Sequence, residues 1–210
     1  MNLLGIESSS RKLSVGLMKK DSFSELNSEK INDTANSLPL LSKKIINNAS
    51  LSFENLDAIC ISSGPGSFTG LRVGMSYAKG IAMALDIPIV PVSTFDSLAY
   101  KNTSEKLSAL IYSHGNTFYI CEYSIDNGIL LKSSEPKSIL KENVLKLSCN
   151  IVFNGPTKIF EDLKAHDLKI EFADLSVNNI LKIAQQNFKL LKTKSLNNLV
   201  PDYVGNFEVK

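Results

Sequence analysis

The chain has 210 residues, of which 43% are hydrophobic and 21% are charged, as in an ordinary globular protein. Its 23 basic and 21 acidic residues leave a formal net charge of +2, which excludes a polybasic protein that binds nucleic acid mainly by charge. The three cysteines, Cys60, Cys121 and Cys149, are far apart and include no CxxC pair. The sequence therefore predicts neither a disulfide framework nor a zinc knuckle.

The first half of the chain is predicted to form three strands, a helix, a strand, a second helix and a further strand. Apolar runs bounded by charged or polar turns indicate the strands, and helical spacing of apolar residues after a cap at Asp33 or Thr34 indicates the first helix. The expected ranges are strands at Asn2–Ile6, Leu13–Met18 and Asp21–Ile31, the helix after Asp33, a strand at Leu56–Ser62, a helix from about Thr69 to Leu85, and a strand at Ile87–Val92.

The second half looks like a reduced copy of the first. The polar stretch 100–106 is the expected boundary, which gives domains at residues 1–100 and 101–210. Asp126-Asn127-Gly128 predicts a hairpin turn. The expected ranges are strands at Leu107–Tyr112, Thr117–Tyr123, Ile129–Lys132 and Ile151–Phe153, and helices at Ser138–Leu145, Pro156–Leu163 and Val177–Leu191, followed by a tail at Pro201–Lys210 whose structure the sequence does not predict.

Neither a signal peptide nor a membrane-spanning helix is expected. The apolar stretch Leu3–Ile6 is too short for a signal peptide. The longest apolar tract, Gly80–Val92, is broken by Asp86 and two prolines, whereas a helix needs about 20 apolar residues to span a bilayer. We therefore expect a cytoplasmic protein without membrane contact.

A glycine-rich loop joins the fourth strand to the second helix. Free amides at a helix start can bind an anion, so one interpretation is a phosphate site. The other is that the glycines permit a tight turn and close helix–strand packing. The spacing fits neither a P-loop nor the dinucleotide fingerprint. The loop residues we single out are Gly64, Pro65, Gly66, Ser67, Thr69 and Gly70, with Arg72 holding either the loop or an acidic partner group.

The segment from Ser63 to Gly74, with Pro91-Val92-Ser93-Thr94, closely resembles the TsaB (YeaZ) family. Leu4-Gly5-Ile6-Glu7-Ser8-Ser9 and Ser37-Leu38-Pro39-Leu40-Leu41 support the resemblance, which is dense over residues 3–98 and thins beyond them. It implies an actin-like α/β fold of two tandem ribonuclease-H-like subdomains, with mixed sheets flanked by helices. The order of strands and helices predicted above agrees with such a fold.

The resemblance also implies a function and partners. TsaB proteins belong to the machinery that installs threonylcarbamoyladenosine in tRNA. They are similar to the catalytic subunit TsaD, pair with it through helices of the first subdomain, and are generally taken to lack its active site. The ATPase TsaE joins the complex, and the synthase TsaC supplies the threonylcarbamoyl group. The resemblance therefore implies contact with tRNA only through the complex, and no cofactor.

The sequence departs from the family pattern in three places. Asp33-Thr34 stands where His-Ser or His-Thr is common, Tyr112-Ser113-His114 stands where Asp-Ala-Arg is common, and Val204-Gly205 stands where an arginine often follows Pro-x-Tyr. Two of the three departures lie in the second half. The second half is therefore the more divergent of the two.

Catalytic and metal sites are not expected. The two histidines, His114 and His166, are too isolated to suggest a metal site, and no Gly-x-Ser-x-Gly elbow marks a hydrolase. Glu7, near the end of the first strand, could hold Mg²⁺ in an actin-like ATPase or phosphotransferase. This autonomous enzyme is the alternative to a non-catalytic subunit, and it requires that the isolated chain bind ATP.

A partner surface is predicted on the first two helices, because both carry apolar residues on more than one face. The small residues Gly74, Ala78 and Ala82 recur at four-residue spacing, which allows close helix approach or packing on the chain's own sheet. We expect a homodimer when the chain is alone and a heterodimer with TsaD. The residues assigned to this surface are Leu38, Leu41, Ile45, Gly74, Tyr77, Ala78 and Ile81.

Overall fold

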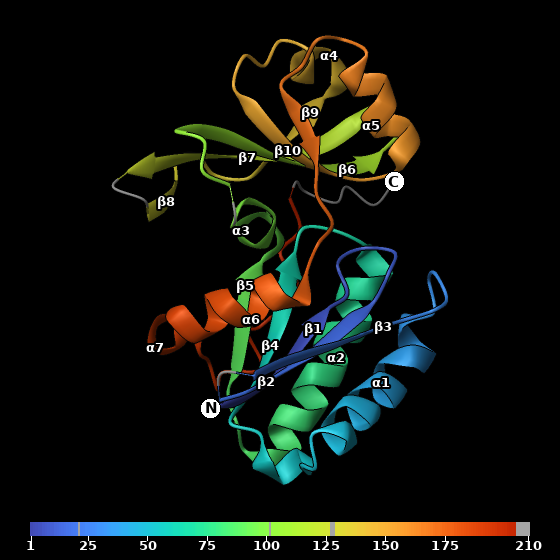
Figure 1. Cartoon of the computed structure of the whole chain (residues 1–210), viewed down its shortest axis with the longest axis vertical. Coiled ribbons are helices and arrows are strands. Elements are labelled where there is room, and N and C mark those ends of the chain that lie inside the picture. Colours follow the sequence, from blue (N-terminus) through green and yellow to red (C-terminus); the bar gives the residue numbers. More distant parts are fainter. Residues whose placement is uncertain (21, 101, 127–128, 205–210) are drawn as a thin grey trace. The chain divides into compact units, whose positions relative to one another are not determined.

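The computed structural model describes residues 1–20, 22–100, 102–126 and 129–204, and the chain divides into two compact units (Figure 1). Unit 1 consists of Met1–Ser97 and Leu175–Asp202. Unit 2 consists of Leu98–Asp174 and the residues from Tyr203 onward.

Unit 1 is built on a five-stranded mixed sheet with the order β3-β2-β1-β4-β5. The first three strands pair antiparallel, and β4 and β5 continue the sheet parallel to β1. The strands are β1 (Asn2–Glu7), β2 (Ser14–Lys19), β3 (Ser22–Asn27), β4 (Ala58–Gly64) and β5 (Ile89–Ser93). The helices are α1 (Thr34–Asn48), the single 3-10 turn η1 (Phe53–Asn55), α2 (Phe68–Leu85), α6 (Val177–Gln186) and α7 (Phe188–Leu191). A further helix, α3 (Thr94–Ala99), begins in unit 1 and continues past Ser97 into unit 2.

The two faces of this sheet are covered by different parts of the chain. On one face, apolar side chains of β1, β2 and β4 form a core with α1 and α2, which lie side by side (Figure 1). On the other face, Gly5 and Gly16 lie against α6, and a Cβ atom built on Gly5 would come within 2.7 Å of Val177 and 2.8 Å of Leu181. The glycines therefore let α6 approach the strands closely.

Local interactions fix the C-terminus of α1 and both ends of α2. Lys19 donates from Nζ to the carbonyl oxygen of Ala49 at 2.9 Å, which places a cation at the C-terminus of α1. Ser67 caps the N-terminus of α2, since its Oγ accepts from the amide of Gly70. The helix ends at Asp86, which adopts a left-handed conformation with φ of 52°.

Unit 2 repeats the strand order of unit 1. Its sheet has the order β11-β10-β6-β7-β8, with β9 paired to β7, and β6, β10 and β11 are parallel. Its strands are β6 (Lys106–His114), β7 (Thr117–Asp126), β8 (Ile129–Lys132), β9 (Lys137–Leu140), β10 (Asn150–Asn154) and β11 (Ile170–Phe172), and its helices are α4 (Lys141–Val144) and α5 (Thr157–Lys164). Both units thus have an antiparallel part, of three strands in unit 1 and four in unit 2, followed by two parallel strands that helices connect. This is the ribonuclease-H-like order predicted from the sequence.

Several predicted elements differ from the observed ones. The range Ser138–Leu145 was predicted to be helical, but β9 takes up its first part because residues 137–140 pair with β7. The predicted helix Val177–Leu191 is interrupted at Asn187, which ends α6 and precedes α7. The prediction also missed α3 and β11, which are both short.

The division into units also differs from the predicted domains 1–100 and 101–210. The first boundary falls after Ser97, but Leu175–Asp202 belongs to unit 1. The physical reason is that α6 buries its apolar side on β1 and β2 of unit 1. In the predicted turn, Asn127 and Gly128 lie outside the described residues, as does Asp21 at the start of the third predicted strand.

Candidate functional site

The glycine-rich loop runs from the end of β4 into the first turn of α2. Gly64 closes the strand with φ of 117°, a backbone conformation that glycine adopts readily. Pro65 is buried, Thr69 is exposed, and Ser67 is the helix cap. The structure therefore brings the loop residues selected from the sequence into one continuous turn at the start of α2.

The turn after β1 fills the space against these glycines. A Cβ on Gly66 would lie 2.2 Å from the carbonyl oxygen of Ser9, and one on Gly70 would lie 2.1 Å from that of Ser8. The amide of Ser67 donates to the carbonyl oxygen of Ser9 at 2.6 Å. The chain's own carbonyl oxygens thus occupy the place beside the helix start, which favours the packing interpretation of the loop over the phosphate interpretation.

Glu7 holds this turn in place from inside the unit. Its side chain is fully buried, and Oε1 accepts hydrogen bonds from both the amide and the hydroxyl of Ser9. Within the described part of the chain, Oε2 has no hydrogen-bond partner. Burial raises the pKa of Glu7 above its ordinary value, although the bonds from Ser9 oppose the shift. Glu7 therefore acts on the loop through Ser9.

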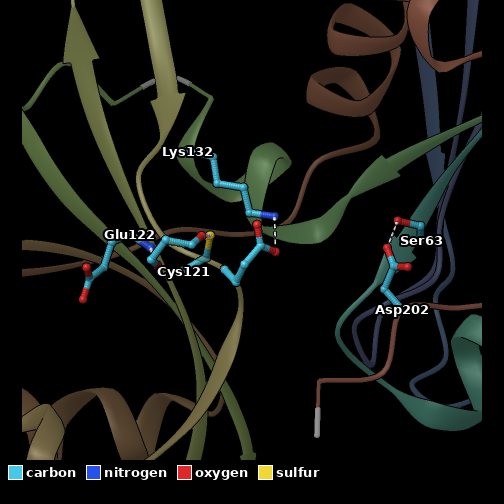
Figure 2. Close-up of polar contacts among 7 residues, drawn as sticks. Ser63, Cys121, Glu122, Lys132 and Asp202 are labelled. Atoms are coloured by element: carbon cyan, nitrogen blue, oxygen red, sulfur yellow. Dashed lines mark hydrogen bonds and ion pairs between the residues drawn. The ribbon is translucent and has the colours of Figure 1, made fainter.

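The C-terminal segment contacts the loop from the other side. Ser63 Oγ donates to Asp202 Oδ2 at 2.7 Å, the dashed contact on the right of Figure 2. The amide of Asp202 donates to the carbonyl oxygen of Ser63 at 2.7 Å. A Cβ on Gly64 would come within 2.6 Å of the carbonyl oxygen of Asp202, so a side chain at Gly64 would prevent this contact. Sequence analysis did not predict this pairing, because 139 positions separate Ser63 from Asp202.

Arg72 lies on the exposed side of the first turns of α2. Its guanidinium carbon is 3.5 Å from the centre of the Phe68 ring, a cation–π contact that fixes both side chains. Arg72 is thus packed on its own helix near the loop.

The predicted partner surface divides into two groups. Leu38, Ile45, Gly74 and Ala78 are buried in the core of unit 1, so their side chains do not reach the surface. For these four residues the predicted assignment was wrong, because the apolar spacing that suggested a partner is the spacing that packs α1 and α2 on the sheet. The remaining three residues are partly exposed, namely Leu41, Tyr77 and Ile81.

A continuous, partly exposed apolar side of α2 adjoins the buried one. It consists of positions i, i+4, i+7, i+8 and i+11, which lie along one side of a helix. Each of its residues is exposed or half-buried, and no atom of the described residues lies within 4 Å of the place where a Cβ on Gly80 would stand. We call this the α2 stripe; its residues are Val73, Tyr77, Gly80, Ile81 and Ala84.

The α2 stripe could have been found in the sequence. Gly80 and Ala84 repeat the four-residue spacing of Gly74, Ala78 and Ala82, but they lie on a different side of the helix. Two large exposed side chains, Leu40 of α1 (69%) and Met83 of α2 (71%), add apolar surface to the same pair of helices.

Neither histidine joins a cluster of ligating side chains. His114 Nδ1 contacts the Ser113 hydroxyl at 2.9 Å, and His166 Nδ1 contacts the carbonyl oxygen of Asp162 at 2.8 Å. Across the described ranges, no three His, Cys, Asp or Glu residues are grouped so that they could hold a metal ion. In the same ranges no helix has the length and apolar character needed to cross a membrane.

Two tandem units of ribonuclease-H-like strand order define an actin-like α/β protein. YeaZ from Pseudomonas aeruginosa has the same fold, with a TM-score of 0.78 at 19% sequence identity over 97% of this chain and 99% of that one. Residues 31–202 match the family described as TsaD: tRNA N6-adenosine threonylcarbamoyltransferase.

Similar sequences carry a more specific name within this family. A tRNA threonylcarbamoyladenosine biosynthesis protein TsaB from Escherichia coli K12 is 28% identical over 183 residues, which cover 80% of this chain and 79% of the relative. A protein with the same description from Buchnera aphidicola subsp. Baizongia pistaciae is 25% identical and covers 97% of each chain. The chain belongs to the TsaD family by its match over residues 31–202, and within it to the TsaB/YeaZ proteins.

Proposed function

We propose that this protein is a non-catalytic subunit in the biosynthesis of tRNA threonylcarbamoyladenosine, and that it pairs with a TsaD-type catalytic subunit through α1 and α2. The observation that supports this proposal is the α2 stripe, an apolar side of a helix that the chain's own core leaves partly uncovered. Apolar surface on neighbouring helices of a folded unit is typical of a protein–protein interface. A second copy of the chain occupies the same surface when the partner is absent.

The carboxylate and the backbone amide that an autonomous enzyme would use to bind Mg²⁺ and phosphate already make hydrogen bonds within unit 1. Glu7 accepts two bonds from Ser9, and the amide of Ser67 is bonded to the carbonyl oxygen of Ser9. A Mg²⁺–nucleotide complex at this place would have to displace the Ser8–Ser9 turn from the glycines it contacts. These contacts favour the subunit over the ATPase or phosphotransferase that the sequence left open.

The remaining partners follow from the same proposal. A net charge of +2 gives this chain little attraction of its own for nucleic acid, so tRNA is bound by the assembled complex. A TsaE-type ATPase joins that complex, and we assign no contact residue to it.

An omission assay tests the proposal. The catalytic subunit, the TsaE-type ATPase, the TsaC-type synthase, tRNA, threonine, bicarbonate and ATP are combined with and without this chain, and modified adenosine is measured by mass spectrometry. We expect product only in the presence of the chain. Equal product without it would overturn the proposal, and calorimetry of the isolated chain with ATP–Mg²⁺ would then test the autonomous enzyme, which requires binding.

A further inference from the structure

The segment after α7 contacts unit 1 at points that lie just before and just after α2 in the chain. We call residues 192–202 the C-terminal strap. It begins at the edge strand β5, where the amide of Ile89 donates to the carbonyl oxygen of Thr193 at 2.9 Å and the amide of Thr193 donates back at 2.8 Å. Lys194 Nζ lies 3.0 Å from Asp86 Oδ1, at the C-terminal cap of α2. The start of the strap is thus joined to the chain directly after α2.

The end of the strap is joined to the chain directly before α2. Leu196 and Leu199 pack in part against the core under α1 and α2. Asp202 then makes its two bonds with Ser63 and covers Gly64 (Figure 2). β4, the glycine-rich loop, α2 and β5 follow one another in the chain. The strap therefore connects the two ends of this stretch through non-covalent contacts.

We propose that the C-terminal strap is a releasable latch that positions the glycine-rich loop and the first turn of α2, with Ser63 and Asp202 as its positioning residues. The inference rests on the proposed function in one respect, because α2 also carries the surface assigned to the partner. When the latch is docked, the loop is held between Asp202 on one side and the Ser8–Ser9 turn on the other. When it is released, the start of α2 loses one of these two supports.

The contacts of the strap are of a kind that can open without unfolding the unit. The side chains of Lys194 and Asp86 are 59% and 91% exposed, so their ion pair is screened by solvent and weak. Asp202 is exposed, and Leu196 and Leu199 are only half-buried. Segments with few buried contacts open locally at a fraction of the cost of global unfolding.

Hydrogen exchange of the isolated chain tests the latch. The amides of Gly70 and Leu71, bonded to the side chain and carbonyl oxygen of Ser67, report on the first turn of α2. In Asp202→Ala we expect these amides to exchange roughly threefold to tenfold faster, the factor that corresponds to the net loss of one such hydrogen bond. Amides of unit 2 should exchange at the wild-type rate.

Matched variants identify the bond responsible. Asn198→Ala changes an exposed side chain of the same strap and should leave the exchange unchanged. Ser63→Ala should match Asp202→Ala, and the double variant should exchange little faster than either single one, since both remove the same bond. Unchanged exchange in Asp202→Ala, an equal effect of Asn198→Ala, or additive effects of the two latch variants would each overturn the proposal.

Binding to the catalytic subunit separates this inference from the function on which it rests. If wild-type protein does not bind the subunit, the proposed function is wrong, while the exchange result still decides whether the latch exists. If wild-type protein binds and the exchange is unchanged by Asp202→Ala, the latch is wrong and the function stands. If wild-type protein binds the subunit and Asp202→Ala exchanges faster, both proposals stand. The apparent dissociation constant of Asp202→Ala for the subunit should then rise by the factor by which the fraction of molecules with a docked latch falls.

Discussion

Replacing Gly80 by glutamate should separate folding from partner binding more cleanly than any other change in α2. Among the described residues, no atom lies within 4 Å of the place where a Cβ on Gly80 would stand, so a side chain can begin there without a clash. Glutamate is a better helix former than glycine by about 0.5 kcal/mol, which corresponds to a rise in melting temperature of roughly 1–2 °C for a protein of this size. The isolated chain should therefore be as stable as the wild type or slightly more stable.

Partner binding should respond in the opposite direction. If another helix covers the α2 stripe, Gly80→Glu places an unpaired carboxylate in that contact. Such burial costs on the order of 2–4 kcal/mol, which is a loss of about 30-fold to 1,000-fold in affinity. Calorimetry or biosensor titration against the TsaD-type subunit measures the loss, and analytical ultracentrifugation measures the corresponding loss of homodimer.

The control for this experiment adds the same charge elsewhere. Gln185→Glu alters an exposed position of α6 in the same unit, and it should leave both affinity and stability near the wild-type values. Wild-type affinity of Gly80→Glu for the catalytic subunit, with the fold intact, would show that the α2 stripe is not the partner surface.

Three further predictions concern the stability of unit 1. Burial raises the pKa of Glu7 above its ordinary value of 4.5. The neutral side chain therefore makes its full contribution to the free energy of unfolding below pH 4.5, and this contribution is lost as the pH rises through the raised folded-state pKa. Urea unfolding across a pH series should show this loss in the wild type and not in Glu7→Gln; identical pH profiles would contradict it. Gly70→Ala forces a Cβ to within 2.1 Å of the Ser8 carbonyl oxygen and should destabilise the chain by about 1–3 kcal/mol. The matched Gly80→Ala should instead stabilise it by up to about 1 kcal/mol, and the same sign for both in thermal unfolding would refute the packing argument. Ala78→Arg and Ile45→Glu place charges at buried sites and should cost about 3 kcal/mol or more, so soluble, cooperatively folded variants would show that these sites are not core.

The sequence predicted the strand order of unit 1 because the apolar runs that form its strands are short and separated by clear turns. It also predicted α2 from about Thr69 to Leu85, and the structure places this helix at Phe68–Leu85. It failed where pairing between distant residues decides the local structure: β9 forms because β7 is available, although its residues also fit a helix. Periodicity likewise shows that a helix has an apolar side, but it does not show whether sheet or partner covers that side, which is why Ala78 was misassigned.

The pairing of Ser63 with Asp202 and the packing of Ser8 and Ser9 on the glycines were beyond sequence reasoning for another reason. Serine and aspartate occur in most turns, and a single sequence offers no sign of which two turns meet in space. The glycine-rich loop could be recognised as a place of close approach, but its neighbours had to be observed.

The location of α6 in unit 1 has a consequence for how the protein is made. The strands that α6 covers leave the ribosome before α6, because the whole of Leu98–Asp174 lies between them in the chain. α6 begins at Val177, which is 158 positions after the end of β2 at Lys19, so at about 5–20 residues per second the nascent chain waits roughly 8–32 s between the two events. During that interval one face of the first sheet, with Gly5 and Gly16 at its centre, has no cover. A product that stops after Ser97 would keep that face bare, so the N-terminal half is expected to need the C-terminal residues before it reaches its native state.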